Sequence, residues 1–134
     1  MSGKTFFDTN VLLYLASRDP RAERAEALLA GGGTISVQVL NEFAVVAHRK
    51  MKMPWEEVEA ALAAIQILCP EPVPITVQTH KAALHIAMRY GYHFYDALVL
   101  AAALEAGCDT IYSEDLQAAQ VIDGQLTIRN PFTH

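Results

Sequence analysis

Apolar residues recur at helical spacing along most of the chain, and short apolar runs separate these stretches. In residues 38–52, for example, Val39, Phe43 and Val46 mark one face of a helix. The pattern predicts helices at 11–15, 19–30, 38–52, 54–69, 79–90 and 96–106, with a short helical turn at 114–119. Short apolar runs predict strands at 4–7, 34–37, 109–112 and 126–128, with 73–76 as a further candidate.

This alternation of strands and helices predicts an α/β fold in which a mainly parallel sheet carries helices on both faces. The segment 96–106 is apolar nearly all round, so its helix is expected at the centre of the fold. In such folds ligands gather at the carboxyl ends of the strands. No linker or repeat interrupts the pattern, and residues 1–134 are therefore expected to form a single domain.

The composition is that of a globular protein without a membrane span. Hydrophobic residues make up 52% of the 134 residues and charged residues 19%, a more apolar balance than a disordered chain carries. The longest purely apolar run, 97–104, is far below the roughly 18 residues that a membrane span requires, which predicts a cytoplasmic protein. Cys69 and Cys108 lack the spacing of a metal or redox motif, so both are expected to be reduced and partly buried.

Four acidic residues stand at strand ends, at a helix start or on a core-facing side of a helix, where a carboxylate calls for an explanation. Asp8 ends the first predicted strand, at the point where a strand is followed by a helix. Glu42 lies beside the apolar stripe of its helix, on the core side, where an uncompensated charge costs several kcal/mol. Asp96 begins the most apolar helix, and Asp115 follows the strand at 109–112.

Each of these acids, taken alone, also has a structural explanation. Asp8 can form an Asx-turn or cap a helix, and Asp96 and Asp115 can be N-caps. Glu42 can pair with a base on its own helix, such as Arg49. Their coincidence at element starts and on inward faces favours one shared site. Acids gathered without a cation would repel one another, whereas Mg²⁺ or Mn²⁺ takes oxygen ligands of this kind.

The net charge of −5 lacks the basic excess that is typical of nucleic-acid-binding proteins. If the four carboxylates hold divalent cations, however, the rest of the chain is close to neutral, and the bound metal attracts phosphate. The local charge at this site then matters more than the total charge of the chain.

The acids lie within short motifs, and one more motif follows near the C-terminus. These motifs are Phe7-Asp8-Thr9-Asn10-Val11-Leu12, Asn41-Glu42-Phe43, Phe94-Tyr95-Asp96-Ala97-Leu98, Tyr112-Ser113-Glu114-Asp115-Leu116 and Asn130-Pro131-Phe132. In this order and spacing, over nearly the whole chain, the sequence resembles the PIN-domain ribonucleases, and specifically the toxins of VapBC toxin–antitoxin modules.

The resemblance implies a three-layer α/β/α fold with an acidic pocket that binds Mg²⁺ or Mn²⁺ and hydrolyses RNA phosphodiester bonds. The family's three best-attested acids, which hold the catalytic metal, are matched by Asp8, Glu42 and Asp96. The fourth acid of the family is matched by Asp115. The resemblance also implies two protein partners: a small antitoxin that lies across the acidic groove, and a second copy of the chain in a homodimer.

Several neighbouring positions belong to the same motifs. Thr9 and Ser113 match hydroxyl positions beside the family's site, and Asn10 is a supporting residue next to them. A further acid or histidine that some members carry falls near Ala118, which offers no such group. The sequence does not specify which RNA is cut.

Other residues near the motifs are interpreted as structural. Any of Asn10, His93 and Tyr95 could help to place the substrate. The simpler interpretation is a helix cap for Asn10 and packing before the central helix for the other two. The basic run at 49–52 could contact phosphate, but a solvated helix face is the simpler interpretation.

Two other functions are compatible with parts of the pattern. Haloacid-dehalogenase-like phosphatases also begin with a strand that ends in aspartate, which accepts the phosphate. They normally carry a second aspartate two residues later, where this chain has Asn10. The other alternative is a PIN-fold domain that binds RNA or a protein partner without cutting.

Overall fold

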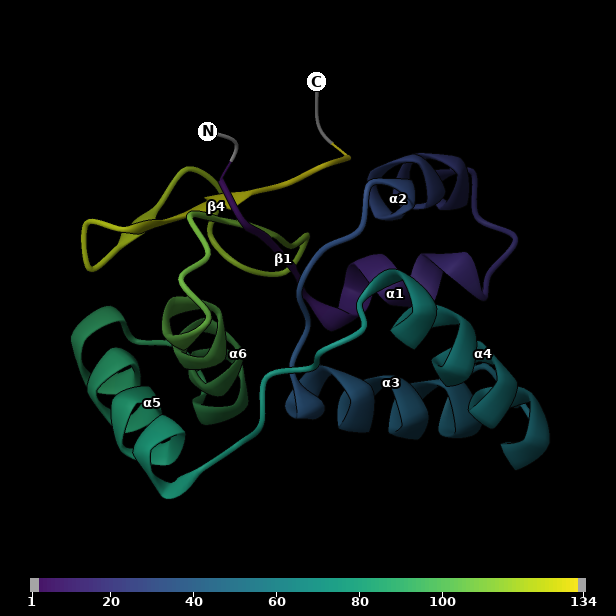
Figure 1. Cartoon of the computed structure of the whole chain (residues 1–134), viewed down its shortest axis with the longest axis horizontal. Helices are drawn as coiled ribbons and strands as arrows, with labels where there is room; N and C mark the ends of the chain where they lie inside the picture. Colours follow the sequence, from purple (N-terminus) through teal and green to yellow (C-terminus); the bar gives the residue numbers. More distant parts are fainter. Residues whose placement is uncertain (1–2, 133–134) are drawn as a thin grey trace.

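The computed structural model describes residues 3–132 (Figure 1). The helices are α1 (Thr9–Leu15), α2 (Arg21–Ala30), α3 (Val37–Arg49), α4 (Trp55–Leu68), α5 (Val77–Tyr90) and α6 (Phe94–Glu105). The strands are β1 (Thr5–Phe7), β2 (Thr110–Tyr112), β3 (Val121–Ile122) and β4 (Leu126–Arg129). The order of strands and helices follows the predicted alternation over most of the chain.

The strands form one mixed sheet in the order β1-β2-β4-β3. β1, β2 and β4 run parallel, with Phe6 opposite Ile111 and Ile111 opposite Ile128, whereas β3 is antiparallel to β4. The parallel strands therefore end at the same edge of the sheet. Asp8 follows β1 at this edge, and Ser113 follows β2. This is the edge at which ligands bind in α/β folds.

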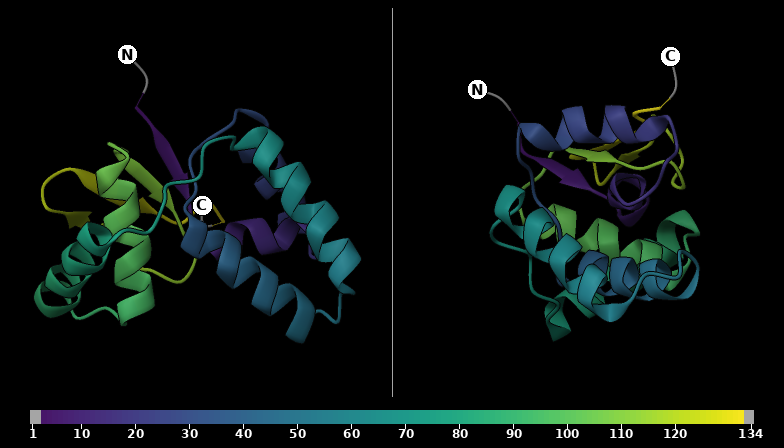
Figure 2. Two further views of the ribbon diagram at one scale, coloured as in Figure 1. Left: turned by 60° about the horizontal axis from the view of Figure 1, so that its bottom comes forward. Right: turned by 90° about the vertical axis from the view of Figure 1, so that its right-hand side faces the viewer.

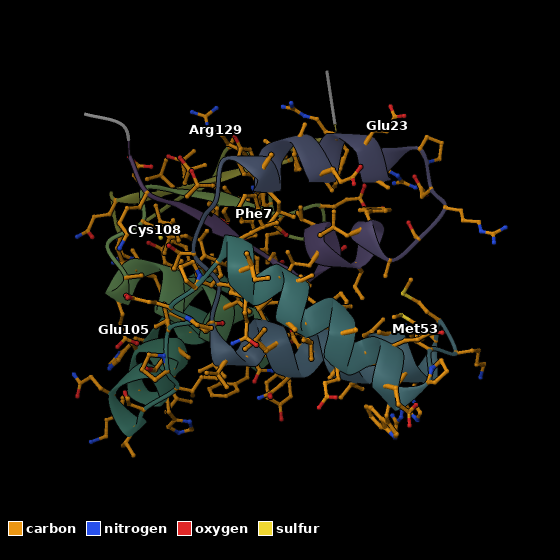
Figure 3. All side chains as sticks on the ribbon, turned by 45° about the vertical axis from the view of Figure 1, so that its right-hand side comes forward. Phe7, Glu23, Met53, Glu105, Cys108 and Arg129 are labelled. Atoms are coloured by element: carbon orange, nitrogen blue, oxygen red, sulfur yellow. The ribbon has the colours of Figure 1, made fainter. Side chains whose placement is uncertain are left out.

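Helices cover both faces of the sheet, so the fold is the predicted three-layer α/β/α arrangement. The right-hand view of Figure 2 shows α2 on one side of the strands and α3–α6 on the other. Arg24 ties α2 to the chain beyond β4, because its Nε donates to the carbonyl oxygen of Pro131 at 3.2 Å. In α6, every residue from 97 to 103 is buried, which confirms that this helix is central. Phe7 is buried between the layers (Figure 3).

The strand predicted at 34–37 is wrong. Thr34 and Ser36 make only single bridges, to Phe6 and Val73 respectively, because the chain turns directly into α3. Ser36 is the N-cap of that helix, and its hydroxyl accepts a hydrogen bond from the amide of Val39. The candidate strand at 73–76 is likewise reduced to the bridge at Val73.

The helical turn predicted at 114–119 is also wrong, since these residues form bends and turns. The hydroxyl of Ser113 accepts hydrogen bonds from the amides of Asp115 and Leu116. Ala119 has a φ of 72°, and its amide donates to the carbonyl oxygen of Ile128 in β4. These contacts hold the segment against the sheet, and the unpredicted strand β3 follows it.

Cys69 and Cys108 are both free and buried, as predicted. Burial raises the pKa of the Cys69 thiol to about 11, so this thiol is protonated at neutral pH. Across residues 3–132, the helices are too short or too polar to cross a membrane.

Gly91 ends α5 in the left-handed region, with a φ of 77°. A Cβ there would meet no heavy atom within 4 Å, so the cost of a side chain is conformational. We expect Gly91→Ala to lower the free energy of unfolding by about 1 kcal/mol. Gly31→Ala is the matched control, because Gly31 also ends a helix but has a φ of −79°. Urea unfolding checks the prediction, and equal losses in the two variants would contradict it.

Candidate active site

The four carboxylates predicted from the sequence line one pocket. This pocket lies between α1, α3 and α6 at the carboxyl edge of the parallel strands and has a volume of about 370 Å³. Its lining consists of Asp8, Thr9, Asn10, Leu13, Gln38, Asn41, Glu42, Val45, Val46, Tyr95, Asp96 and Asp115. The fold therefore brings acids from distant parts of the chain to one place.

Asp8 lies at the buried end of this pocket, with 4% of its surface exposed. It is the N-cap of α1, and its Oδ1 accepts a hydrogen bond from the amide of Thr9 at 2.8 Å. Its Oδ2 accepts from the hydroxyl of Ser113 at 2.7 Å and from Nδ2 of Asn10 at 3.2 Å. Asp8 therefore caps α1 and also lines the pocket, so both interpretations of this residue apply.

Asn10 connects the start of α1 to the loop after β2. Its Nδ2 donates to Asp115 Oδ2 at 3.1 Å and lies 3.2 Å from Ser113 Oγ. Its Oδ1 accepts from the amide of Glu114 at 3.0 Å. Asn10 is not the helix cap that the sequence suggested, because Asp8 fills that position. Its amide instead fixes the position of Asp115 relative to Asp8.

Glu42 is held by neutral donors. Its Oε1 accepts from the hydroxyl of Thr9 at 2.7 Å, and its Oε2 accepts from Nε2 of Gln38 at 3.4 Å. Gln38 lies one helical turn before Glu42 on α3, where its side chain can reach the carboxylate. The alternative ion pair with Arg49 does not form, since neither residue takes part in the ion pairs of the described chain.

Burial and mutual repulsion raise the pKa of two of the acids. Burial raises the pKa of Asp8 to about 6, and the charges of Glu42 and Asp96 add to this shift, although hydrogen bonds oppose it. The pKa of Asp96 is raised by burial and by the charge of Asp115. Asp96 lies in the first turn of α6, and His93, not Asp96, is the N-cap. Carboxylates that lie close together without a neutralising charge raise one another's pKa in this way.

In residues 3–132, the ion pairs join Arg21 to Asp19 and Glu114, and Arg89 to Asp123. None of them neutralises an acid of the pocket. As placed, no three acidic, histidine or cysteine side chains of this part of the chain form a set that could hold a metal ion. A cation here would therefore need water or small side-chain movements to complete its ligands. The donor chemistry still fits Mg²⁺ or Mn²⁺, which take carboxylate and water oxygens.

Two pocket residues were not predicted as part of a site. Gln38 and Asn41 lie on the same side of α3 as Glu42, and the four-residue spacing from Gln38 to Glu42 is the signal that could have identified Gln38. Of the two interpretations of Tyr95, packing alone does not describe it, because the side chain is 62% exposed and lines the pocket. The apolar pattern does not distinguish an exposed aromatic side chain at the start of a buried helix from a packed one.

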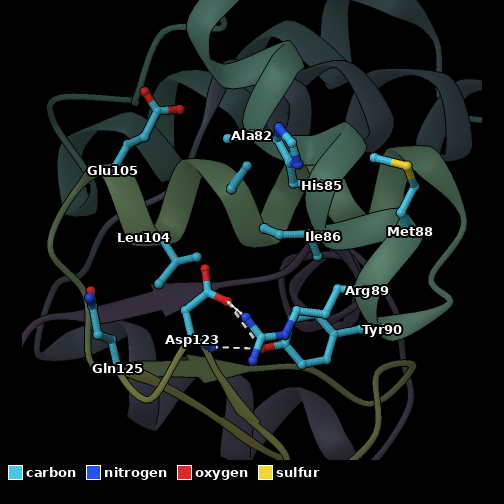
Figure 4. A pocket seen from close by; sticks show the side chains of 11 residues that line it. Ala82, His85, Ile86, Met88, Arg89, Tyr90, Leu104, Glu105, Asp123 and Gln125 are labelled. Atoms are coloured by element: carbon cyan, nitrogen blue, oxygen red, sulfur yellow. Dashed lines mark hydrogen bonds and ion pairs between the residues drawn. The ribbon is translucent and has the colours of Figure 1, made fainter.

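A larger cavity lies elsewhere, between α5, α6 and the β3–β4 hairpin (Figure 4). It has a volume of about 730 Å³. Its group of paired polar side chains centres on Asp123, since Arg89 lies 3.7 Å from its carboxylate and the Tyr90 hydroxyl donates to the same oxygen. Among the residues that the structure describes, this larger cavity gathers no comparable set of carboxylates, so the acidic pocket is the candidate site.

The geometry defines a class of protein: a three-layer α/β/α domain with an acidic pocket at the carboxyl edge of its parallel strands. A family model for the PIN domain matches residues 5–123. The chain belongs to the PIN domain family. This assignment removes support from the phosphatase alternative.

Solved structures share the fold over most of the chain. VapC20 of Mycobacterium tuberculosis, described as a sarcin-ricin loop cleaving toxin, is 23% identical, with a TM-score of 0.71 over 90% of this chain and 98% of that one. A toxin–antitoxin complex from Klebsiella pneumoniae is 18% identical, with a TM-score of 0.72 over 96% and 98%. VapBC2 of Rickettsia felis, bound to a promoter DNA fragment, is 17% identical, with a TM-score of 0.68 over 94% and 97%. Comparison with curated proteins gave no match.

Proposed function

We propose that this protein is a metal-dependent endoribonuclease that hydrolyses RNA phosphodiester bonds and serves as the toxin of a toxin–antitoxin pair. The observation that carries the proposal is the gathering of four carboxylates around one pocket, with no ion pair to any of them among residues 3–132. Membership of the PIN domain family and the structural likeness to VapC toxins support it.

The acids of the pocket would hold the cation, which we propose to be Mg²⁺ or Mn²⁺. Asp8 and Asp96 would be ligands, and Glu42 and Asp115 would contribute directly or through water. When bound, such an ion activates water and stabilises negative charge on the phosphate. The carboxylates would therefore act as ligands rather than as covalent nucleophiles.

The neutral residues around the acids keep them in place. Ser113 donates to Asp8 at 2.7 Å, and Thr9 donates to Glu42 at the same distance. Asn10 links Asp8 to Asp115 through one amide group. Such supporting hydrogen bonds orient metal ligands, and their loss typically costs about 10–100-fold in affinity or activity.

The proposed partners follow from the same assignment. The substrate would be RNA, and a small antitoxin would lie across the acidic groove of a cytoplasmic homodimer. The Klebsiella pneumoniae structure is a toxin–antitoxin complex, and the Rickettsia felis VapBC2 structure contains promoter DNA. These likenesses support an antitoxin partner for this chain.

The proposal is tested with purified protein and a set of diverse RNAs. We expect cleavage with added Mg²⁺ or Mn²⁺, a fall to background in excess chelator, and recovery when the metal is restored. Undiminished cleavage in chelator would contradict the metal dependence. If none of the RNAs is cut with metal present, the non-catalytic PIN-fold alternative is favoured instead.

A further inference from the structure

The pocket has an apolar side that metal binding does not explain. Beside the acids, its lining includes Leu13, Val45, Val46 and Tyr95, which we call the apolar lining. Val45 is 50% exposed and Tyr95 is 62% exposed. A site that held only a cation and a phosphate group would need oxygen and nitrogen donors, not exposed apolar surface.

Tyr95 is the residue of this lining best placed to contact a nucleobase. It directly precedes Asp96 in the first turn of α6. Its ring packs edge-on against Phe94, with ring centroids 5.9 Å apart, and its hydroxyl makes no hydrogen bond within residues 3–132. An aromatic ring with free surface, one residue from a candidate metal ligand, is suited to stack on a base next to the bound phosphate.

We propose that Tyr95 is a positioning residue that stacks on an unpaired nucleobase adjacent to the cleaved phosphate, with Val45 completing the apolar contact. This inference rests on the proposed ribonuclease function and deepens it. Bases in an RNA duplex have their faces covered by their neighbours, so the contact requires a single-stranded or looped substrate.

The charge along α3 favours RNA over a protein as the occupant. Arg49 lies seven residues after Glu42, which places it about 10 Å further along the helix on nearly the same side. It is exposed and makes no hydrogen bond or ion pair within the described part of the chain. A strand that leaves the pocket over the apolar lining would carry its next phosphates toward this free cation.

The test uses a fluorescein-labelled pool of random-sequence 12-nucleotide single-stranded RNA. In Mg²⁺, Tyr95→Ala and Tyr95→Leu are expected to raise KM for the pool about tenfold with kcat changed less than threefold, because stacking is a binding contribution. Tyr95→Phe keeps the ring and should stay within twofold of wild type. Met88→Ala is the control, since Met88 is 74% exposed on α5 and lies outside the pocket.

The outcomes separate this inference from the proposed function. An unchanged KM in Tyr95→Ala, or equal damage from Tyr95→Phe, would overturn the stacking contact. Loss of a co-purifying protein in Tyr95→Ala with unchanged KM would assign the lining to a protein partner. If wild type does not cut RNA, the ribonuclease proposal fails. Fluorescence anisotropy of the pool with Ca²⁺ then tests the stacking contact by itself. Binding about tenfold weaker in Tyr95→Ala supports stacking, and equal or undetectable binding overturns it.

Discussion

Asp8→Asn and Asp96→Asn are each expected to lower the rate of RNA cleavage by on the order of a thousandfold. Both substitutions preserve the size of the side chain and remove its negative charge. If these acids hold the cation, the loss removes the charge stabilisation on which the reaction depends. Initial rates of cleavage with saturating Mg²⁺ or Mn²⁺ measure the effect.

Asp109→Asn is the matched control for this prediction. Asp109 is exposed and lies at the amino end of β2, at the opposite edge of the sheet from the pocket. We expect its substitution to leave the rate unchanged. A similar fall in all three variants would indicate a general loss of folding, and full activity in Asp8→Asn or Asp96→Asn would contradict their assignment as metal ligands.

The same change at Asp8 is expected to stabilise the metal-free protein at alkaline pH. The pKa of Asp8 rises from 3.8 to about 6 on folding, so the folded state holds the proton more tightly than the unfolded state. The stability that this proton provides is present below about pH 4 and is lost as pH rises through 6. At pH 8, Asp8→Asn should therefore raise the free energy of unfolding by up to about 3 kcal/mol, less any cost of altered contacts with Ser113.

Urea unfolding in chelator at pH 4.5 and pH 8 measures this effect. The difference between variant and wild type should be small at the lower pH and in favour of the variant at the higher pH. Added Mn²⁺ should stabilise wild type more than the variant. A variant that is less stable than wild type by the same amount at both pH values would show that the ionised Asp8 carries no penalty in the fold.

Asp8 is thus expected to favour activity at the expense of the stability of the metal-free protein. The fold buries the Asp8 carboxylate and places other acids around it. This lowers the free energy of unfolding of the metal-free protein when Asp8 is ionised. Sites that bind a ligand commonly lower the stability of the unliganded protein in this way. In the proposed function, the cation that the acids attract offsets the cost.

The acids could be predicted because of where they stand in the chain. Asp8 follows a buried strand, Asp115 follows the next parallel strand, and Glu42 interrupts an apolar helix face. The motifs added their order and spacing. Since parallel strands share one carboxyl edge, predicting β1 and β2 was sufficient to bring Asp8 and Asp115 together.

The errors arose where hydrogen bonds between serine hydroxyls and nearby backbone amides override the apolar pattern. The run at 34–37 has the composition of a strand, but Ser36 caps α3 and leaves single bridges. The segment 114–119 has helical residues, but the hydroxyl of Ser113 and the φ of 72° at Ala119 hold it as a turn. The contacts of Asn10 with Ser113, Glu114 and Asp115 join residues that are distant in sequence, so the local pattern suggested a helix cap instead.

In the proposed function, the carboxylates of this pocket bind a divalent cation. The most direct measurement is the anomalous scattering of a crystal of the protein soaked in Mn²⁺. We predict a peak in the pocket within about 2.0–2.3 Å of carboxylate oxygens of Asp8 and Asp96, lost in the Asp8→Asn variant. A fully soaked crystal without a peak in this pocket, or with manganese bound only elsewhere, would contradict the account.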